Sequence, residues 1–359
     1  MDRSFQVVIM YILTHLSLIF FMYPRNIIAS TGEGHWLPIM IGLIFHFLFI
    51  AIYMKGLSYF PNKDLITIYL GIGKVIAIIF LLPITLYFIM IIIITIRAYS
   101  EIITIVFLSK TPLWAIMAFL LFISTYLASK EVESIFRTGA LIAFLFLPLI
   151  ILIFGSSIQN VDWHYLFPIV DKQFTFFTSS SFYVSFFAVG GGFLFLGFIQ
   201  PYLSYQRKKI LIGALFLIPC FILSVYIPIL TFGQATASTF MFPFVMALDT
   251  VELDWIIFDR VTMFFLMSLI TFIMLYISLV LWKTIRIINV CFPSVKPVYL
   301  TIILSVFIFL LCLLIPNWND IERIFFWNTY LRFYVICAVP ISVLYFGMRI
   351  RKEGNNENF

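Results

Sequence analysis

The segment Phe182–Leu203 decides the fold, and it reads FYVSFFAVGGGFLFLGFIQPYL. It holds no charged residue, and it is as long as the roughly 20 apolar residues that a helix needs to cross a bilayer core. Gly190, Gly191 and Gly192 interrupt it near the middle. Three successive glycines leave the backbone free to unwind, so that a ligand can reach bare N–H and C=O groups. The alternative is close packing of this helix against another through small residues.

The rest of the chain has the same apolar character. Hydrophobic residues make up 63% of the 359 residues and charged residues 11%, against about 45–50% and about 25% in soluble domains. Backbone polar groups in lipid must be bonded within their own segment, so long apolar runs predict helices. No soluble-looking stretch is long enough for a second domain. The sequence therefore predicts an all-α integral membrane protein with a single membrane domain over residues 1–359.

Apolar runs between polar breaks predict ten transmembrane helices. The predicted spans are 5–28, 36–54, 75–106, 113–128, 136–154, 182–203, 210–231, 262–282, 298–315 and 330–347. Ten helices suggest two halves of five, and inverted repeats of this kind bind substrate near the midplane where helices are interrupted. The first helices of the two halves are then 5–28 and 182–203.

Basic residues are distributed unevenly over the predicted loops. With the amino terminus inside, the inner loops hold fifteen of the 22 basic residues: Arg3, Lys55, Lys63, Lys74, Lys130, Arg137, Arg207, Lys208, Lys209, Lys283, Arg286, Lys296, Arg349, Arg351 and Lys352. The outer set is Arg25, Arg97, Lys110, Lys172, Arg260, Arg323 and Arg332. Because cytoplasmic loops carry the excess of lysine and arginine, both termini are predicted to be cytoplasmic. The same rule accounts for the net charge of +6 without a nucleic-acid partner.

Three predicted outer segments are rich in acidic and aromatic residues: 155–181, 232–261 and Asn317–Trp327. Trp and Tyr favour the headgroup layer of a bilayer. These segments are therefore predicted to form short interfacial helices that cap the bundle, or alternatively a gate over a ligand site.

The first span carries polar residues at mid-depth, namely Thr14, His15 and Ser17. Intramembrane polar residues usually face the bundle interior or a cavity. We interpret His15, and His46 at similar depth in the second span, as neutral histidines that bind a neighbouring carbonyl; a proton relay is the alternative. Arg97 and Glu101 lie four residues apart on one helix face and are predicted to pair.

Motifs for catalysis or metal binding are absent from the sequence. There is no P-loop, no H-E-x-x-H and no G-x-S-x-G, and Cys220, Cys291, Cys312 and Cys337 show no C-x-x-C spacing. No Asp or Glu lies at the centre of a predicted span, where a sodium- or proton-coupled pump often keeps one. We therefore predict no enzyme activity, no cofactor and no metal.

Several short motifs follow one another at characteristic spacings. They are Tyr23-Pro24-Arg25, Gly32-Glu33-Gly34-His35-Trp36, Glu133 with Arg137, Asn160-Val161-Asp162 with Leu166 and Pro168, Gly192 to Pro201, Phe242-Pro243 and Asp259-Arg260. In this order, within ten spans, they resemble the B-subunit family of endospore germinant receptors, the spore germination permeases. That family belongs to the amino acid–polyamine–organocation transporter superfamily. The resemblance runs from Phe5 to about Phe346.

The resemblance implies a five-plus-five inverted-repeat transporter fold in the inner membrane of a spore. It implies a membrane subunit of a nutrient germinant receptor that senses a small molecule, amino acid-like or other, beside A and C subunits. The ligand would bind between the first and sixth spans, where the expected ligand-binding residues are Thr14, His15, Ser17, Phe20, Gly190, Gly191, Gly192, Phe193 and Phe195.

The sequence departs from the family at three places. Thr14–Leu18 replaces a glycine-containing stretch, while Leu194 and Thr262 stand where acidic residues are common. These differences suggest a ligand other than an amino acid recognised through its ammonium group, or a member that has lost sensing. Two other functions share the fold: a proton-coupled amino acid or amine permease, and a gated ion or small-solute pathway in the receptor complex.

Overall fold

Helices account for all the regular secondary structure in the part of the chain that the computed structural model describes, residues 2–190, 192–251 and 261–356. The α-helices are α1 (Arg3–Ile19), α2 (Tyr23–Ile28), α3 (Trp36–Leu57), α4 (Leu65–Ile72), α5 (Lys74–Val106), α6 (Leu113–Ala128), α7 (Val132–Ser157), α8 (Ser180–Gly190), α9 (Leu196–Ile199), α10 (Arg207–Phe232), α11 (Gln234–Ala237), α12 (Pro243–Asp249), α13 (Val261–Cys291), α14 (Pro297–Leu313) and α15 (Trp318–Asn356). Short 3-10 helices are η1 (Ile158–Asn160), η2 (Trp163–Leu166), η3 (Thr175–Thr178) and η4 (Phe193–Phe195).

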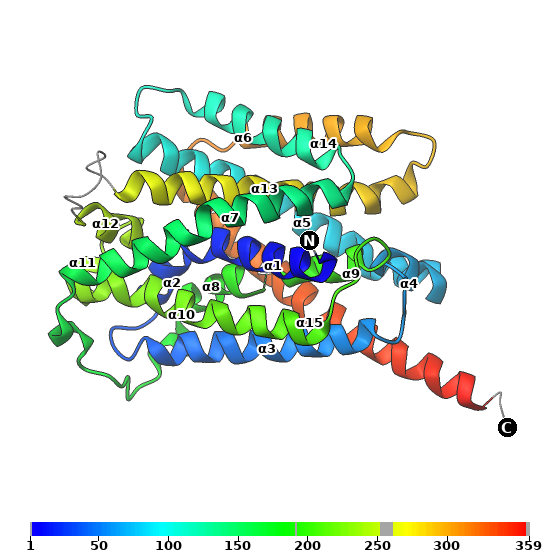
Figure 1. Cartoon of the computed structure of the whole chain (residues 1–359), viewed down its shortest axis with the longest axis horizontal. Helices are drawn as coiled ribbons and strands as arrows, with labels where there is room; N and C mark the ends of the chain where they lie inside the picture. Colours follow the sequence, from blue (N-terminus) through cyan, green and yellow to red (C-terminus); the bar gives the residue numbers. More distant parts are fainter. Residues whose placement is uncertain (1, 191, 252–260, 357–359) are drawn as a thin grey trace.

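Seven helical segments among these residues are long and apolar enough to cross a membrane. They are Trp36–Leu57, Lys74–Val106, Val132–Asn160, Ser180–Ile199, Arg207–Phe232, Val261–Cys291 and Trp318–Lys352. Three further apolar helices, α1, α6 and α14, have 16 or 17 residues. The long helices run side by side (Figure 1). The chain is thus an all-helical, multi-pass membrane protein.

The helices α1 and α8 lie at the centre of the bundle. α1 packs against α7, α8, α10 and α13, and α8 also packs against α2, α3 and α15. Nearly all residues of α1 from Ile9 onwards are buried. By contrast, α6 and α14 lie at the periphery (Figure 1). The helices packed around α1 and α8 can therefore supply hydrogen-bond partners for the backbone groups at the ends of these two helices.

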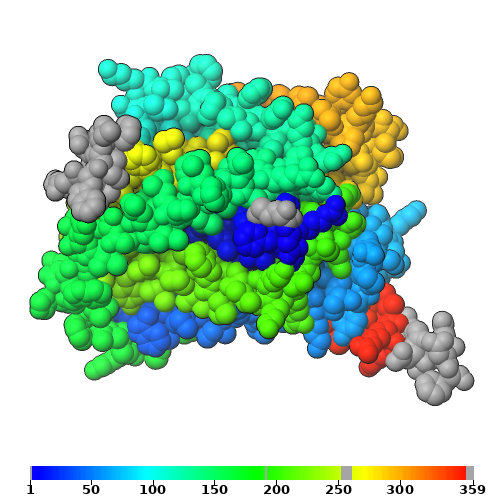
Figure 2. Space-filling view, in the orientation of Figure 1, coloured from blue at the N-terminus to red at the C-terminus, as the bar shows by residue number. Residues whose placement is uncertain are grey.

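Lipid-facing surfaces surround this centre. Large apolar side chains point outward along the peripheral helices; Phe144 on α7, for example, is 87% exposed. On the face shown in Figure 2, α1 reaches the surface between α7 and α10. There, Val8, Ile9 and Ile12 form the floor of an apolar groove of about 780 Å³.

The two ends of the bundle differ. The start of α1 and the carboxyl end of α15 point toward the end that carries α4, whereas α11 and α12 lie at the opposite end (Figure 1). η1–η3 lie in the predicted outer segment 155–181, and α11 and α12 lie in 232–261. Residues 252–260 of that segment fall outside the described residues.

Two predictions about polar positions were wrong. The segment Asn317–Trp327 does not form a separate interfacial helix, because α15 runs without a break from Trp318. Lys283, which was counted as a loop residue, lies inside α13 with 1% exposure. Arg97 and Arg332, which were assigned to the outer ends of predicted spans, are buried, with 3% and 0% exposure. Each of these residues lies within a long helix, α5, α13 or α15, so the helix carries the basic side chain into the bundle.

Candidate functional site

The first site element is a break within the predicted span 5–28. α1 ends at Ile19, a turn follows at Phe20–Met22, and α2 begins at Tyr23 with Pro24 in its first turn. Proline suits this position because the first N–H groups of a helix have no intrahelical partner. The carbonyl of Ser17, near the end of α1, accepts a hydrogen bond from the Tyr99 hydroxyl on α5. A side chain from a regular helix thus satisfies a backbone group that the break leaves without its usual partner.

The second break follows Gly190, where α8 ends before η4 and α9. The Val189 carbonyl accepts a hydrogen bond from His46 Nδ1 at 2.6 Å. The Leu194 carbonyl in η4 accepts one from the Tyr53 hydroxyl at 3.2 Å. Both donors come from α3. Breaks in buried backbone persist only when their polar groups are paired, and α3 and α5 supply the partners for the two interruptions.

His15 joins α1 to the second break. Its ring lies directly over Gly192, and a Cβ atom added at Gly192 would collide with the ring. The glycine is required there by space, since its φ of −87° is open to any residue. Close packing against another helix, which the sequence offered as an alternative to unwinding, is therefore present at Gly192, beside the break.

A chain of hydrogen bonds connects these elements. His46 contacts the Val189 carbonyl through Nδ1 and the Tyr11 hydroxyl through Nε2. The Tyr11 carbonyl accepts from His15 Nδ1 at 2.8 Å. Because both Nδ1 atoms face carbonyls, which only accept, each ring carries its proton on Nδ1 when neutral. The predicted contact of each histidine with a carbonyl is confirmed.

His15 Nε2 is the end of this chain and has no hydrogen-bond partner. In the neutral ring that nitrogen is an acceptor. The His15 side chain is fully buried, and a buried acceptor without a donor costs about 1–3 kcal/mol. The arrangement therefore suits a ligand that carries a hydrogen-bond donor.

The other predicted site residues occupy distinct surroundings. The hydroxyls of Thr14 and Ser17 donate to carbonyls of their own helix, and Ile336 occupies the space beside Gly190. Gly191 lies outside the described residues. The structure places Thr14, His15 and Ser17 in α1, and Gly190 and Gly192 at the second break.

The three phenylalanines predicted as site walls do not share one space. Phe20 packs in an aromatic cluster with Phe154, Phe244 and Phe265, with ring centroids 5.0–5.4 Å from its own. Phe193 lies against His46 and Tyr53, and Phe195 lies against Phe136. The structure groups only Phe193 directly with the histidine chain.

Sequence reasoning missed the tyrosines of this site. Tyr11, Tyr53 and Tyr99 are fully buried and hold the breaks through their hydroxyls. Their positions deep inside apolar runs were an available signal, because a buried tyrosine hydroxyl usually finds a hydrogen-bond partner.

Side-chain contacts link helices at the predicted outer end of the bundle. Arg25 on α2 forms an ion pair with Glu322 on α15, whose carboxylate also accepts from Trp318 Nε1 at 2.7 Å. The segment between α7 and α8 lies against the α2–α3 turn. There, a Cβ at Gly34 would be 2.6 Å from the Asp171 nitrogen, and the φ of +62° also favours glycine.

Asp171 holds that covering segment in place. Its carboxylate accepts hydrogen bonds from the backbone nitrogens of Gln173 and Thr175 and from the hydroxyls of Thr175 and Thr31. Burial by itself raises the pKa of Asp171, but these hydrogen bonds outweigh it and lower the pKa. Hydrogen bonds to the charged form have this effect because they stabilise the carboxylate.

A second set of side-chain contacts links helices at the opposite end of the bundle. Asp64, which is 2% exposed, caps α4 and accepts from Arg286 on α13 at 2.6 Å. Arg286 also donates to the Tyr202 hydroxyl, just after α9. One arginine thus ties α13 to α4 and to the second half of the interrupted segment.

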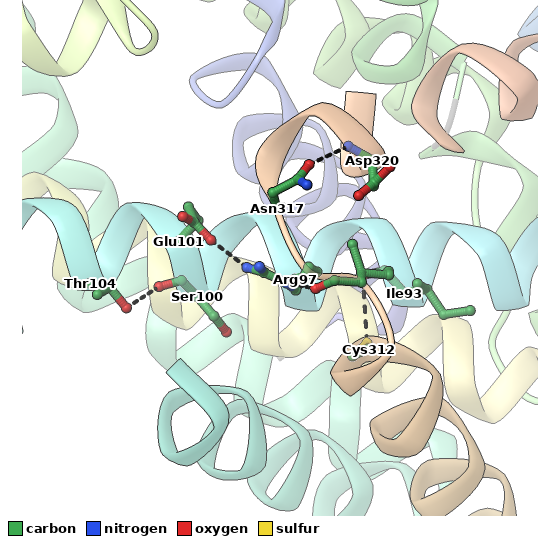
Figure 3. Close-up of polar contacts among 9 residues, drawn as sticks. Ile93, Arg97, Ser100, Glu101, Thr104, Cys312, Asn317 and Asp320 are labelled. Carbon is green, nitrogen blue, oxygen red and sulfur yellow. Dashed lines mark hydrogen bonds and ion pairs between the residues drawn. The ribbon is translucent and has the colours of Figure 1, made fainter. Parts of the chain in front are cut away.

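A further charge pair lies on α5, beside the α14–α15 linker. Arg97 pairs with Glu101, as predicted, and donates to the Ile315 carbonyl (Figure 3). In the same region the Cys312 thiol lies 3.8 Å from the Ile93 carbonyl. Within the described ranges no three His, Cys, Asp or Glu side chains form a group that could hold a metal ion.

Comparisons with known proteins identify the family and the fold of this chain. Residues 3–321 match the family described as "Spore germination protein". The crystal structure of MhsT in complex with L-phenylalanine matches with a TM-score of 0.67 and 13% identity, over 94% of this chain and 87% of that chain. At this identity the likeness shows a shared transporter fold alone. None of the curated proteins matches. Since the family match spans most of its length, the chain belongs to the family of spore germination proteins.

Proposed function

We propose that this chain is the membrane subunit of a nutrient germinant receptor, in which a small molecule binds between the interrupted helices and triggers germination. It acts in the spore inner membrane beside an A and a C subunit, with both termini in the cytoplasm, and it catalyses no reaction. The observation that carries the proposal is the His15–Gly192 contact, which joins α1 to the second break. A ligand that supplies a donor to His15 Nε2 favours one arrangement of the two breaks over another.

The order of helices supports ten spans in two inverted halves within one membrane domain. Counting α1 with α2, and α8 with η4 and α9, as single interrupted spans gives each half a broken first helix. A short helix follows the second span of each half: α4 after α3, and α11 after α10. α4 and α11 lie at opposite ends of the bundle (Figure 1), as an in-plane pseudo-two-fold axis requires.

The closed contacts at both ends support a sensing role. The Arg25–Glu322 pair and the Asp64–Arg286 pair shut the bundle on either side of His15. A ligand reaches the breaks only when one set opens, so its binding energy can shift the balance between open and closed states. That shift is the signal passed to the other subunits.

Gly192→Ala tests the site. The added methyl group must displace the His15 ring, so spores carrying this variant should lose most of their response to nutrients while the protein still accumulates. Gly155→Ala on α7 is the matched control, because nothing lies within 4 Å of a Cβ there; its response should equal that of the wild type. A normal response in Gly192→Ala spores would contradict the proposal.

A proton-coupled permease is the second candidate, and Lys283 favours it. This lysine is 1% exposed on α13, its ammonium lies 4.2 Å from the Phe88 ring centroid, and among the described residues no carboxylate pairs with it. Intramembrane ionisable groups often mark proton or ion pathways. Uptake of labelled amino acids into vesicles, driven by a proton gradient and lost in Lys283→Met, would establish transport. Absence of such uptake would favour the receptor.

A further inference from the structure

Two arginines are buried in the bundle, and their surroundings differ. Arg97 has a carboxylate partner, Glu101, and a backbone carbonyl partner, Ile315 (Figure 3). Arg332, on α15, is 0% exposed. Over the described parts of the chain, no carboxylate lies within ion-pair distance of Arg332. A buried guanidinium remains charged, so an uncompensated one is costly.

The known partners of Arg332 are neutral. One terminal nitrogen donates to the Val184 carbonyl on α8 at 2.8 Å, and the other donates to Asn328 Oδ1 at 2.9 Å. The guanidinium carbon lies 5.1 Å and 5.2 Å from the ring centroids of Phe187 and Phe325. Aromatic faces attract a cation, but they supply no negative charge.

Hydrogen-bond donors beside this charge remain unused. Arg332 Nε and Asn328 Nδ2 are buried and have no hydrogen-bond partner. Both groups can only donate, and the Asn328 amide already contacts the guanidinium through Oδ1. One missing acceptor with negative charge would therefore satisfy both.

We infer that Arg332 and Asn328 form a binding site for a small monovalent anion, a carboxylate or a halide. The anion would compensate the guanidinium and accept the unused hydrogen bonds, which are strong when charge assists them. The site adjoins Val184 and Phe187, on α8 ahead of its break at Gly190. Occupancy would therefore fix α15 to the first half of the interrupted segment.

The anion has two possible sources with the same chemistry. It is either a free inorganic ion such as chloride or the carboxylate of the molecule sensed at the breaks, and only the second case rests on the proposed function. Thermal unfolding of the purified full chain in detergent distinguishes them. Chloride, acetate, an amino acid and its uncharged amide are titrated at constant ionic strength, with a bulky sulfonate as the balancing anion.

The wild-type midpoint of unfolding should rise and saturate with chloride or with carboxylates. Stabilisation by chloride alone identifies an inorganic ion; stabilisation by acetate and the amino acid, but not by the amide, identifies a carboxylate. Arg332→Gln should abolish the response, and Arg332→Lys should need about tenfold more anion because a charge-assisted hydrogen bond is lost. Arg97→Gln should keep the wild-type anion dependence.

Asn328→Asp tests whether loss of the anion response in Arg332→Gln reflects misfolding. It places a carboxylate beside Arg332, so the protein should remain stable and become insensitive to added anions. The inference is wrong if the wild-type midpoint is the same in every anion, or if Asn328→Asp responds like the wild type. Neither result would alter the Gly192→Ala outcome, so failure here is distinguishable from failure of the proposed function.

Discussion

Arg25 on α2 and Glu322 on α15 form an ion pair although 297 residues separate them in the chain. α2 is the second part of the first interrupted span, and α15 also carries Arg332 and Ile336 against α8. The pair therefore links two elements that surround the site. Its side chains are 31% and 38% exposed, so water and ions can compete for it.

Reversing this pair should first weaken and then restore the response. If the ligand favours the closed state, Arg25→Glu raises the nutrient concentration for half-maximal germination by about two- to fivefold, as a partly exposed ion pair permits. The double variant Arg25→Glu/Glu322→Arg should return most of the way to the wild-type value. Asp320→Asn, which affects an exposed pair with Arg323, is the control and should cause no shift.

Asp64→Asn tests the opposite end. Asparagine can still cap α4, but it loses the charge that pairs with Arg286. Arg286 is 33% exposed and can turn partly to water, so we expect destabilisation of about 1–2 kcal/mol. It is measured as a lower midpoint of unfolding in detergent. Asp2→Asn, at the exposed Asp2–Lys209 pair, should leave the midpoint unchanged. Equal effects of the two variants would contradict a specific closure.

The covering segment should loosen in acid. The pKa of Asp171 is lowered in the folded protein, so its carboxylate stabilises the fold above the unfolded value of about 3.9. That stability is lost as pH falls below about 3.9 toward the folded pKa. Protease sensitivity of the segment between α7 and α8 should therefore increase below about pH 3.9 in the wild type. In Asp171→Asn it should be high at neutral pH and vary little with pH.

Thiol labelling checks the orientation. His164, between α7 and α8, and Lys208, at the start of α10, are both exposed. In the proposed topology they lie on opposite sides of the membrane. In a background lacking the exposed Cys291, a cysteine in place of His164 should react with an impermeant reagent added outside. A cysteine in place of Lys208 should react only after the membrane is permeabilised. Labelling in the reverse pattern would overturn the assignment of cytoplasmic termini.

Much of the architecture was predictable from composition and run length. Leu113–Ala128 was predicted from its flanking polar residues and forms α6 with the same bounds. Gly190–Gly192 marked the break after α8. The break at Phe20–Met22 carries no glycine, and only Pro24 hinted at it. Local propensity does not reveal such a break, because tertiary partners such as Tyr99 compensate the backbone groups that it frees.

The sequence by itself determined that the chain is helical and membrane-embedded, because a bilayer leaves few options for an apolar backbone. Only the tertiary structure decided which distant groups meet: His15 with Gly192, Arg25 with Glu322, Asp64 with Arg286. It also decided that Lys283 and Arg332, which lie at the ends of apolar runs in the sequence, are buried. Burial and pairing depend on how helices pack around one another, and residue order along one helix does not specify that packing.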